Sequence, residues 1–163
     1  MRKIISIIGN SCIGKSTISK ILSESTGIPV FDIQEYYDKC EGTGHSRELK
    51  AWLMLEMDIK DSPSAILESS GLTGKESNIY KLFDKKIIVK LVSSTTYQLV
   101  QRYKEKLSRL EFSSETMPIC HMKELIRARS KMYDTLKADL VFDVQQINSE
   151  SIAFAIEQHL NSD

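Results

Sequence analysis

Eight residues near the start of the chain have the types and the spacing that bind phosphate. Gly9 to Ser16 read Gly-Asn-Ser-Cys-Ile-Gly-Lys-Ser and match G-x-x-x-x-G-K-[ST] in full, between an apolar run and an amphipathic helical pattern. The two glycines let the backbone wrap closely with its N–H groups turned inward, and the helix that follows points the positive end of its dipole at the same place. We predict that the loop holds the phosphates of a nucleoside triphosphate through Gly9, Asn10, Ser11, Cys12, Ile13, Gly14, Lys15, Ser16 and Thr17.

Two side chains of this loop have separate predicted tasks. Lys15 is predicted to reach the terminal phosphates and to act in catalysis, and the Ser16 hydroxyl is predicted to coordinate Mg²⁺. Cys12 is interpreted as a tolerated filler, because nothing near it in the sequence marks an activated thiolate. The cofactors implied are ATP and Mg²⁺.

Carboxylates follow two further apolar runs, at Asp32 and at Glu68. If these runs are parallel strands, both carboxylates lie at the carboxyl edge of the sheet, where open α/β sheets bind ligands. Asp32 is predicted to accept a proton from an acceptor hydroxyl or to hold Mg²⁺ through water. Glu68 competes for the metal, and the sequence leaves open which carboxylate takes it. In the alternative interpretation Asp32 only caps a helix that begins near Gln34.

The segments that must position these residues alternate between two patterns. Short runs that are apolar without alternation indicate strands covered on both faces, here Lys3–Ile8, Ile28–Phe31, Ala65–Leu67, Ile87–Val92 and Leu140–Val144. Helical patterns occupy Lys15–Ser25, Arg47–Ile59, Tyr97–Leu110, Ile119–Leu136 and Ser151–Leu160. The capping-box spacing of Thr73 and Glu76 adds a short helix that carries Ile79, Leu82 and Phe83. The predicted fold class is α/β, with a five-stranded parallel sheet between two layers of helices in a single domain over residues 1–163.

The composition argues against several classes of protein. The 163 residues carry 22 Lys plus Arg against 22 Asp plus Glu, so their bulk charge does not favour binding to long nucleic acid or to an anionic membrane. The apolar run from Ile4 to Ile8 is too short for a membrane span or a secretion signal, so a cytoplasmic protein with no membrane partner is expected. The cysteines number three and are scattered, which argues against a zinc site and a disulfide framework.

Nearly the whole chain resembles the small P-loop kinases, the group that contains shikimate, gluconate, nucleoside and nucleoside-monophosphate kinases. The specific part of the resemblance is the Gly9–Ser16 loop. Other parts are Val30-Phe-Asp32, Ala65-Ile-Leu-Glu68-Ser-Ser-Gly71, Val89-Lys-Leu-Val-Ser-Ser ahead of Arg102 and Arg109, and Arg129-Ser-Lys-Met-Tyr133 ahead of Ala138-Asp139. The resemblance implies a P-loop kinase fold and the transfer of a phosphoryl group from ATP.

The resemblance also implies a short lid over about residues 102–118. In this lid Arg102 and Arg109 would be catalytic residues that stabilise charge on the moving phosphoryl group. On a helical wheel Arg102, Lys106 and Arg109 share one stripe. The alternative for this stripe is a solvated basic face.

Acceptor-binding helices are implied over about residues 33–60. Tyr36 and Tyr37 would stack on a flat acceptor, with packing in the core as the alternative. Arg47 and Arg129 would bind an anionic group through paired hydrogen bonds, with a solvated surface position as the alternative. Asp32 and Gly71 complete the substrate-binding residues implied by the resemblance.

Two departures separate this chain from a shikimate-type kinase. Such a kinase would carry a second Asp two places after the first and three glycines after the third strand, whereas this chain has Gln34 and Ser70-Gly71-Leu72. We predict an ATP-dependent kinase that transfers the γ-phosphoryl group to a hydroxyl or phosphate of a small molecule, in a monomer or homodimer. The Asp32–Tyr37 stretch, which looks like the acceptor segment of nucleoside kinases, and Arg47 favour a nucleoside or nucleotide as this acceptor. The alternatives are a shikimate- or gluconate-type metabolite kinase and a P-loop NTPase switch that is not a kinase.

Overall fold

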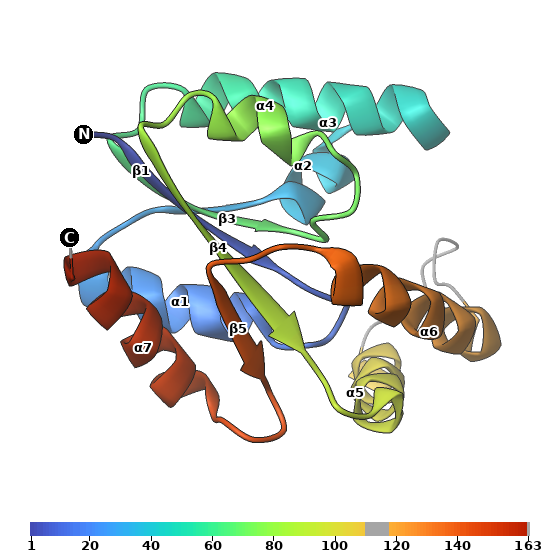
Figure 1. Cartoon of the computed structure of the whole chain (residues 1–163). Helices are drawn as coiled ribbons and strands as arrows, with labels where there is room; N and C mark the ends of the chain where they lie inside the picture. Colours follow the sequence, from blue (N-terminus) through green and yellow to red (C-terminus); the bar gives the residue numbers. More distant parts are fainter. Residues whose placement is uncertain (110–117, 163) are drawn as a thin grey trace.

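The computed structural model describes residues 1–109 and 118–162, with the side chain of Arg109 outside the described part (Figure 1). Five strands form one sheet in the order β2-β3-β1-β4-β5, and every neighbouring pair is parallel. The strands are β1 (Lys3–Ile8), β2 (Val30–Asp32), β3 (Ser64–Ser69), β4 (Lys85–Val92) and β5 (Leu140–Asp143). The helices are α1 (Lys15–Thr26), α2 (Ile33–Lys39), α3 (Gly44–Ile59), α4 (Glu76–Tyr80), α5 (Thr96–Arg109), α6 (Ile119–Thr135) and α7 (Ser149–Asn161). The predicted parallel sheet with flanking helices is confirmed.

Helices cover both faces of the sheet (Figure 1). On one face Ile5 and Ile7 of β1 lie in a core cluster with residues of α1, α5, α6 and α7. On the other face Ile4 lies in a second cluster with residues of α2, α3 and α4. Because side chains alternate across a strand, the consecutive isoleucines of β1 supply both cores. Within the described residues, no helix is both long and apolar enough to cross a membrane.

Some observed bounds differ from the predicted ones. β2 ends on Asp32 itself and leaves out Ile28. α4 ends at Tyr80, so Leu82 and Phe83 follow the helix instead of lying on it, which corrects the prediction. The N–H groups of Leu82 and Phe83 donate to the carbonyl oxygens of Ile79 and Tyr80, at 3.0 and 3.2 Å, so the chain after Tyr80 continues in tighter three-residue turns instead of an α-helix.

The three strands that matter for the site end at one edge of the sheet. β3 lies between β1 and β2, and Asp32 is in register with Glu68. Ile8 is in register with Ser69, and the Gly9–Ser16 loop leaves β1 directly after that pair. Parallel pairing thus brings the loop and both carboxylates to the same edge.

Candidate active site

The Gly9–Ser16 loop, called the phosphate loop below, has the backbone that its glycines permit. Gly14 has φ of 107° and is the N-cap of α1, a left-handed conformation that side chains rarely adopt. A Cβ at Gly9 would lie 2.9 Å from the carbonyl oxygen of Leu91, so the loop packs too closely on β4 for any larger residue. The loop therefore curls tightly over the N-terminus of α1, where an anion is stabilised.

Lys15 folds back over this loop. Its ammonium group donates to the carbonyl oxygens of Gly9 and Asn10, both at 2.9 Å. Burial lowers the pKa of Lys15 to about 8, while the carboxylates of Glu68 and Asp32 act in the opposite direction. The amine is thus still mostly protonated at neutral pH and close to both carboxylates.

Glu68 is the most buried charged group of the site, with 3% of its surface exposed. Its Oε2 accepts a hydrogen bond from the Ser16 hydroxyl at 2.9 Å. Burial raises the pKa of Glu68, and the neighbouring Asp32 adds to this rise, whereas the bond from Ser16 opposes it. The structure joins the two residues that the sequence assigned to the metal on separate grounds.

Asp32 is the N-cap of α2 and accepts from the N–H of Gln34 at 3.0 Å. The capping role that the sequence offered as the alternative for Asp32 is thus present. The capping hydrogen bond uses the Oδ1 atom of Asp32, and it holds this carboxylate beside Glu68 at the edge of the sheet. The catalytic role of Asp32 stays a prediction.

The donor set fits Mg²⁺ bound together with phosphate. Within residues 1–109 and 118–162, no three His, Cys, Asp or Glu side chains gather as a metal site. A hydroxyl and two carboxylates, from Ser16, Glu68 and Asp32, supply the oxygen ligands that Mg²⁺ prefers, and this ion usually keeps several waters and binds substrate phosphates. Mg²⁺ would therefore be held by a few protein oxygens and the nucleotide.

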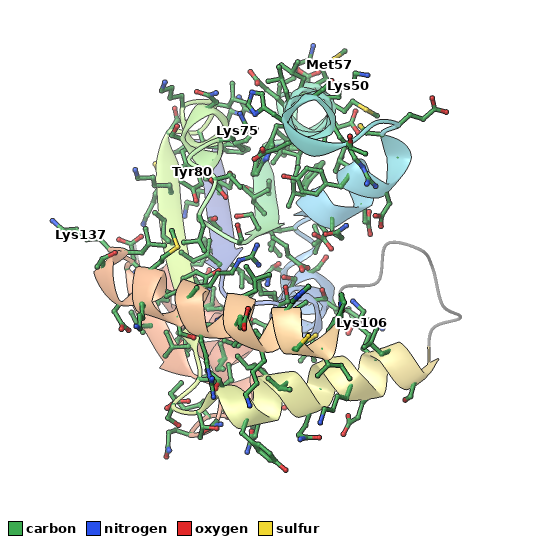
Figure 2. All side chains as sticks on the ribbon, turned by 90° about the vertical axis from the view of Figure 1, so that its right-hand side faces the viewer. Lys50, Met57, Lys75, Tyr80, Lys106 and Lys137 are labelled. Atoms are coloured by element: carbon green, nitrogen blue, oxygen red, sulfur yellow. The ribbon has the colours of Figure 1, made fainter. Side chains whose placement is uncertain are left out.

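Arg102 of α5 lies against the phosphate loop. Its Nη1 is 3.4 Å from the carbonyl oxygens of both Cys12 and Ile13. Figure 2 shows α5, which carries Lys106, beside α6. The side chain of Arg109 and residues 110–117 of the predicted lid lie outside the described residues.

Cys12 has a positive φ of 61°, which is uncommon for a residue with a side chain. Burial raises the pKa of the Cys12 thiol, against the opposing effect of Lys106, Lys15 and Arg102. A neutral thiol is a poor nucleophile, which supports the interpretation of Cys12 as a filler.

α6 contacts the loops on both sides of the site. The buried Asn10 amide donates to the hydroxyl of Ser130 at 3.2 Å. The positive charge of Arg129 lowers the pKa of Lys15, so this arginine lies near the phosphate loop, and its role in binding an acceptor anion stays a prediction. The hydroxyl of Tyr133 donates to the carbonyl oxygen of Ser70 at 2.6 Å, just after β3.

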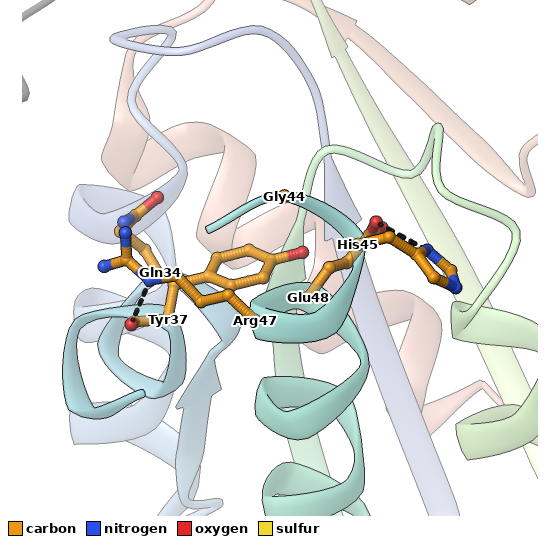
Figure 3. Close-up of a pocket in the computed structure, with 6 residues that line it drawn as sticks. All are labelled: Gln34, Tyr37, Gly44, His45, Arg47 and Glu48. Atoms are coloured by element: carbon orange, nitrogen blue, oxygen red, sulfur yellow. Dashed lines mark hydrogen bonds and ion pairs between the residues drawn. The ribbon is translucent and has the colours of Figure 1, made fainter. Parts of the chain in front are cut away.

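A cavity of about 450 Å³ lies between α2 and α3, the helices for which the sequence predicts acceptor binding (Figure 3). Its lining residues are Gln34, Tyr37, Gly44, His45, Arg47 and Glu48. Arg47 lies in the first turn of α3 and donates from Nε to the carbonyl oxygen of Tyr37 at 3.0 Å. Tyr36 is a correction: only 6% of it is exposed, and its hydroxyl donates to Asp58 at 2.9 Å, so its ring packs in the core and does not line this cavity.

No model of a known protein family matches the chain. Its sequence is 24% identical over 145 residues to shikimate kinase of Aquifex aeolicus, covering 83% of each chain. The crystal structure of that shikimate kinase superposes with a TM-score of 0.64 at 23% identity, over 96% of this chain and 95% of the other. The chain thus has the fold of these small P-loop kinases, and its Gly9–Ser16 loop matches the phosphate-binding motif in full.

Two other small P-loop kinases share the fold at lower identity. A gluconokinase from Sinorhizobium meliloti has a TM-score of 0.67 at 13% identity, with both chains fully covered. Deoxyadenosine kinase from M. mycoides has a TM-score of 0.62 at 17% identity, over 98% of this chain and 100% of the other. One fold therefore carries acceptors as different as a sugar acid and a nucleoside, so the fold alone does not name the acceptor.

The sequence did not single out two residues that hold the turn after β3 beside this site. Glu76 was interpreted only as part of a helix cap, yet its carboxylate accepts from the Gly71 N–H at 3.1 Å and from the Thr73 hydroxyl at 2.9 Å. Tyr133 was noted only as part of a motif, with no role. The Thr-x-x-Glu spacing pointed to Glu76, but no local signal indicates that Tyr133 reaches a residue 63 positions away.

Proposed function

We propose that this protein is an ATP-dependent kinase that transfers the γ-phosphoryl group to a hydroxyl or phosphate of a small molecule. The observation that carries the proposal is the meeting of Lys15, Ser16 and the paired carboxylates at one edge of the sheet. Phosphoryl transfer asks a protein mainly to position two oxygens and to neutralise charge, and these groups supply both functions.

Each group has a role that its position supports. The amides of the phosphate loop and Lys15 bind the phosphates of ATP, and Lys15 leaves the loop carbonyls to do so. Ser16 and Glu68 serve Mg²⁺, which supplies charge neutralisation between the phosphates. Asp32 accepts the proton of the acceptor hydroxyl, and Arg102 moves from the loop carbonyls to the phosphates.

The acceptor is proposed to carry an anionic group. Of the two tyrosines that would stack on a base, Tyr36 is buried and does not line the cavity, whereas Tyr37 does line it. Arg129 beside the phosphate loop and Arg47 at the cavity favour an acceptor with a phosphate or a carboxylate. A nucleotide meets this condition, and so does a hydroxylated acid of the shikimate or gluconate type, which is the second candidate.

A coupled assay of ADP release tests the proposal. The purified chain is given MgATP with one compound at a time from a panel of nucleosides, nucleotides, shikimate and gluconate. We expect one class of compound to raise ADP release sharply. A slow release that no compound changes would contradict the kinase and favour the NTPase switch.

A matched pair of variants links the activity to the phosphate loop. Lys15→Ala should abolish ADP release while the protein remains folded by circular dichroism. Lys20→Ala removes another lysine of α1, one whose side chain is 77% exposed, and should leave the activity unchanged. Retained turnover in Lys15→Ala would refute the proposed mechanism.

A further inference from the structure

The peptide group between Ser70 and Gly71 is held at both of its ends. Its carbonyl oxygen accepts from the Tyr133 hydroxyl at 2.6 Å. Its N–H donates to Oε1 of Glu76 and to the hydroxyl of Ser69, each at 3.1 Å. Because the C=O and N–H of a trans peptide point in opposite directions, Tyr133 and Glu76 fix this group from two sides.

Both side chains that hold the peptide are buried. Tyr133 is 2% exposed and Glu76 is 4% exposed. A buried carboxylate is costly unless its oxygens are paired, and Glu76 pairs one with the Gly71 N–H and the other with the Thr73 hydroxyl. The turn after β3 is therefore built around these two groups.

The peptide needs holding because it contains a glycine. Gly71 has φ of 76°, and a Cβ there would lie 2.8 Å from the side chain of Ile8, so no larger residue fits. Glycine adopts positive and negative φ about equally, which makes this peptide group free to rotate unless hydrogen bonds prevent it.

The helix that carries Tyr133 is itself fixed to the phosphate loop. Ser130, one turn before Tyr133, accepts from the Asn10 amide at 3.2 Å. At the C-terminal end of α6, the buried ammonium of Lys90 donates to the carbonyl oxygens of Tyr133 at 2.7 Å and Leu136 at 2.8 Å. The position of the peptide is thus tied to that of the nucleotide site.

We propose that Tyr133 and Glu76 are positioning residues of the acceptor site, which hold the Ser70–Gly71 peptide in one orientation. The inference rests on the proposed function and on the substrate-binding role that the family resemblance implies for Gly71. Neither residue touches the reacting atoms. They keep the turn after β3 in the single shape against which an acceptor binds, and they do so before any ligand arrives.

Hydrogen–deuterium exchange on the full chain without ligand tests the orientation. Tyr133→Phe keeps the buried ring and removes the hydroxyl, so amides of residues 70–75 should exchange about tenfold faster, the size expected for loss of one buried hydrogen bond. The control is Tyr80→Phe (Tyr80 is labelled in Figure 2), which removes a hydroxyl bonded to Ser6 at 2.8 Å and should not change this segment. Unchanged exchange in Tyr133→Phe would overturn the proposal.

A second variant and a kinetic measurement separate positioning from stability. Glu76→Gln removes the charge that fixes Gly71 and Thr73, and it should speed exchange in the same segment. With the panel compound that supports ADP release, Tyr133→Phe should raise the KM for that compound about tenfold and change the KM for ATP less than twofold. Equal rises in both KM values would mean a merely structural role. If no compound is phosphorylated, the proposed function fails and the acceptor role of these residues fails with it, whereas unchanged exchange in a protein that phosphorylates a panel compound overturns this inference alone.

Discussion

Nucleotide affinity is expected to fall as Lys15 loses its proton. Burial lowers the pKa of this amine to about 8 in the ligand-free protein. Bound phosphates stabilise the ammonium form, so the complex keeps a proton that the free protein gives up above pH 8. Binding then takes up a proton, and the affinity weakens as the pH rises through this value.

The size of the effect follows from the same pKa. The apparent dissociation constant is multiplied by a factor of one plus the ratio of neutral to protonated Lys15. For a pKa of about 8, this factor is about 1.1 at pH 7 and about 11 at pH 9. Affinity for MgADP should therefore fall about tenfold between pH 7 and pH 9. Phosphate groups with a second pKa of about 6 keep their charge over this range. Burial raises the pKa of the neighbouring Cys12 thiol, away from this range.

Calorimetric titration of MgADP between pH 7 and pH 9 measures this dependence. In Lys15→Arg the charge persists at every pH, so the affinity should change little. Lys20→Arg alters an exposed lysine of the same helix and should keep the tenfold fall. A flat profile in the unmodified protein, or the same fall in Lys15→Arg, would refute the assignment of the proton to Lys15.

Three further substitutions test other parts of the site. Asp32→Asn should lower kcat by about a hundredfold or more, because the catalytic base is lost. The melting temperature and the affinity for MgADP should change little, because Asn caps a helix as well as Asp does. An equal loss of affinity would remove Asp32 as the base. Gly71→Ala should cost about 1–3 kcal/mol in urea unfolding, because the new Cβ meets Ile8 at a positive φ; an unchanged midpoint would contradict this. Arg102→Ala should lower kcat about tenfold or more. The control is Arg127→Ala, which removes an exposed arginine of α6 and should leave kcat unchanged. Equal effects of the two substitutions would show that Arg102 acts only through the net charge of the protein.

The fold was predictable because its signals are local. Runs such as Lys3–Ile8 are apolar on both faces, and only a sheet covered on both sides requires that pattern. Once the strands are parallel, carboxylates that follow two of them must share an edge, so the pairing of Asp32 with Glu68 follows from topology.

The acceptor side was less predictable because its contacts are not local. Tyr36 and Tyr37 are consecutive on α2, and which ring faces the core depends on where α3 packs. The hydroxyl of Tyr36 finds Asp58 on α3, and Trp52 of the same helix donates to the Tyr37 hydroxyl at 3.2 Å. A sequence pattern on α2 alone holds no information about these partners.

The charges of the site argue that phosphate and metal enter together. Lys15 and Arg129 are two cations that disfavour each other, and Glu68 and Asp32 are two carboxylates that do the same. Without a ligand the four charges sum to zero. A nucleotide without a metal would bring further negative charge beside both carboxylates, and a metal without a nucleotide would sit beside both cations. The metal complex of the nucleotide places the phosphates beside the two cations and the metal beside the two carboxylates. The site, in which Lys15 binds the loop carbonyl oxygens while no ligand is present, is therefore suited to bind Mg²⁺ and phosphate as one unit.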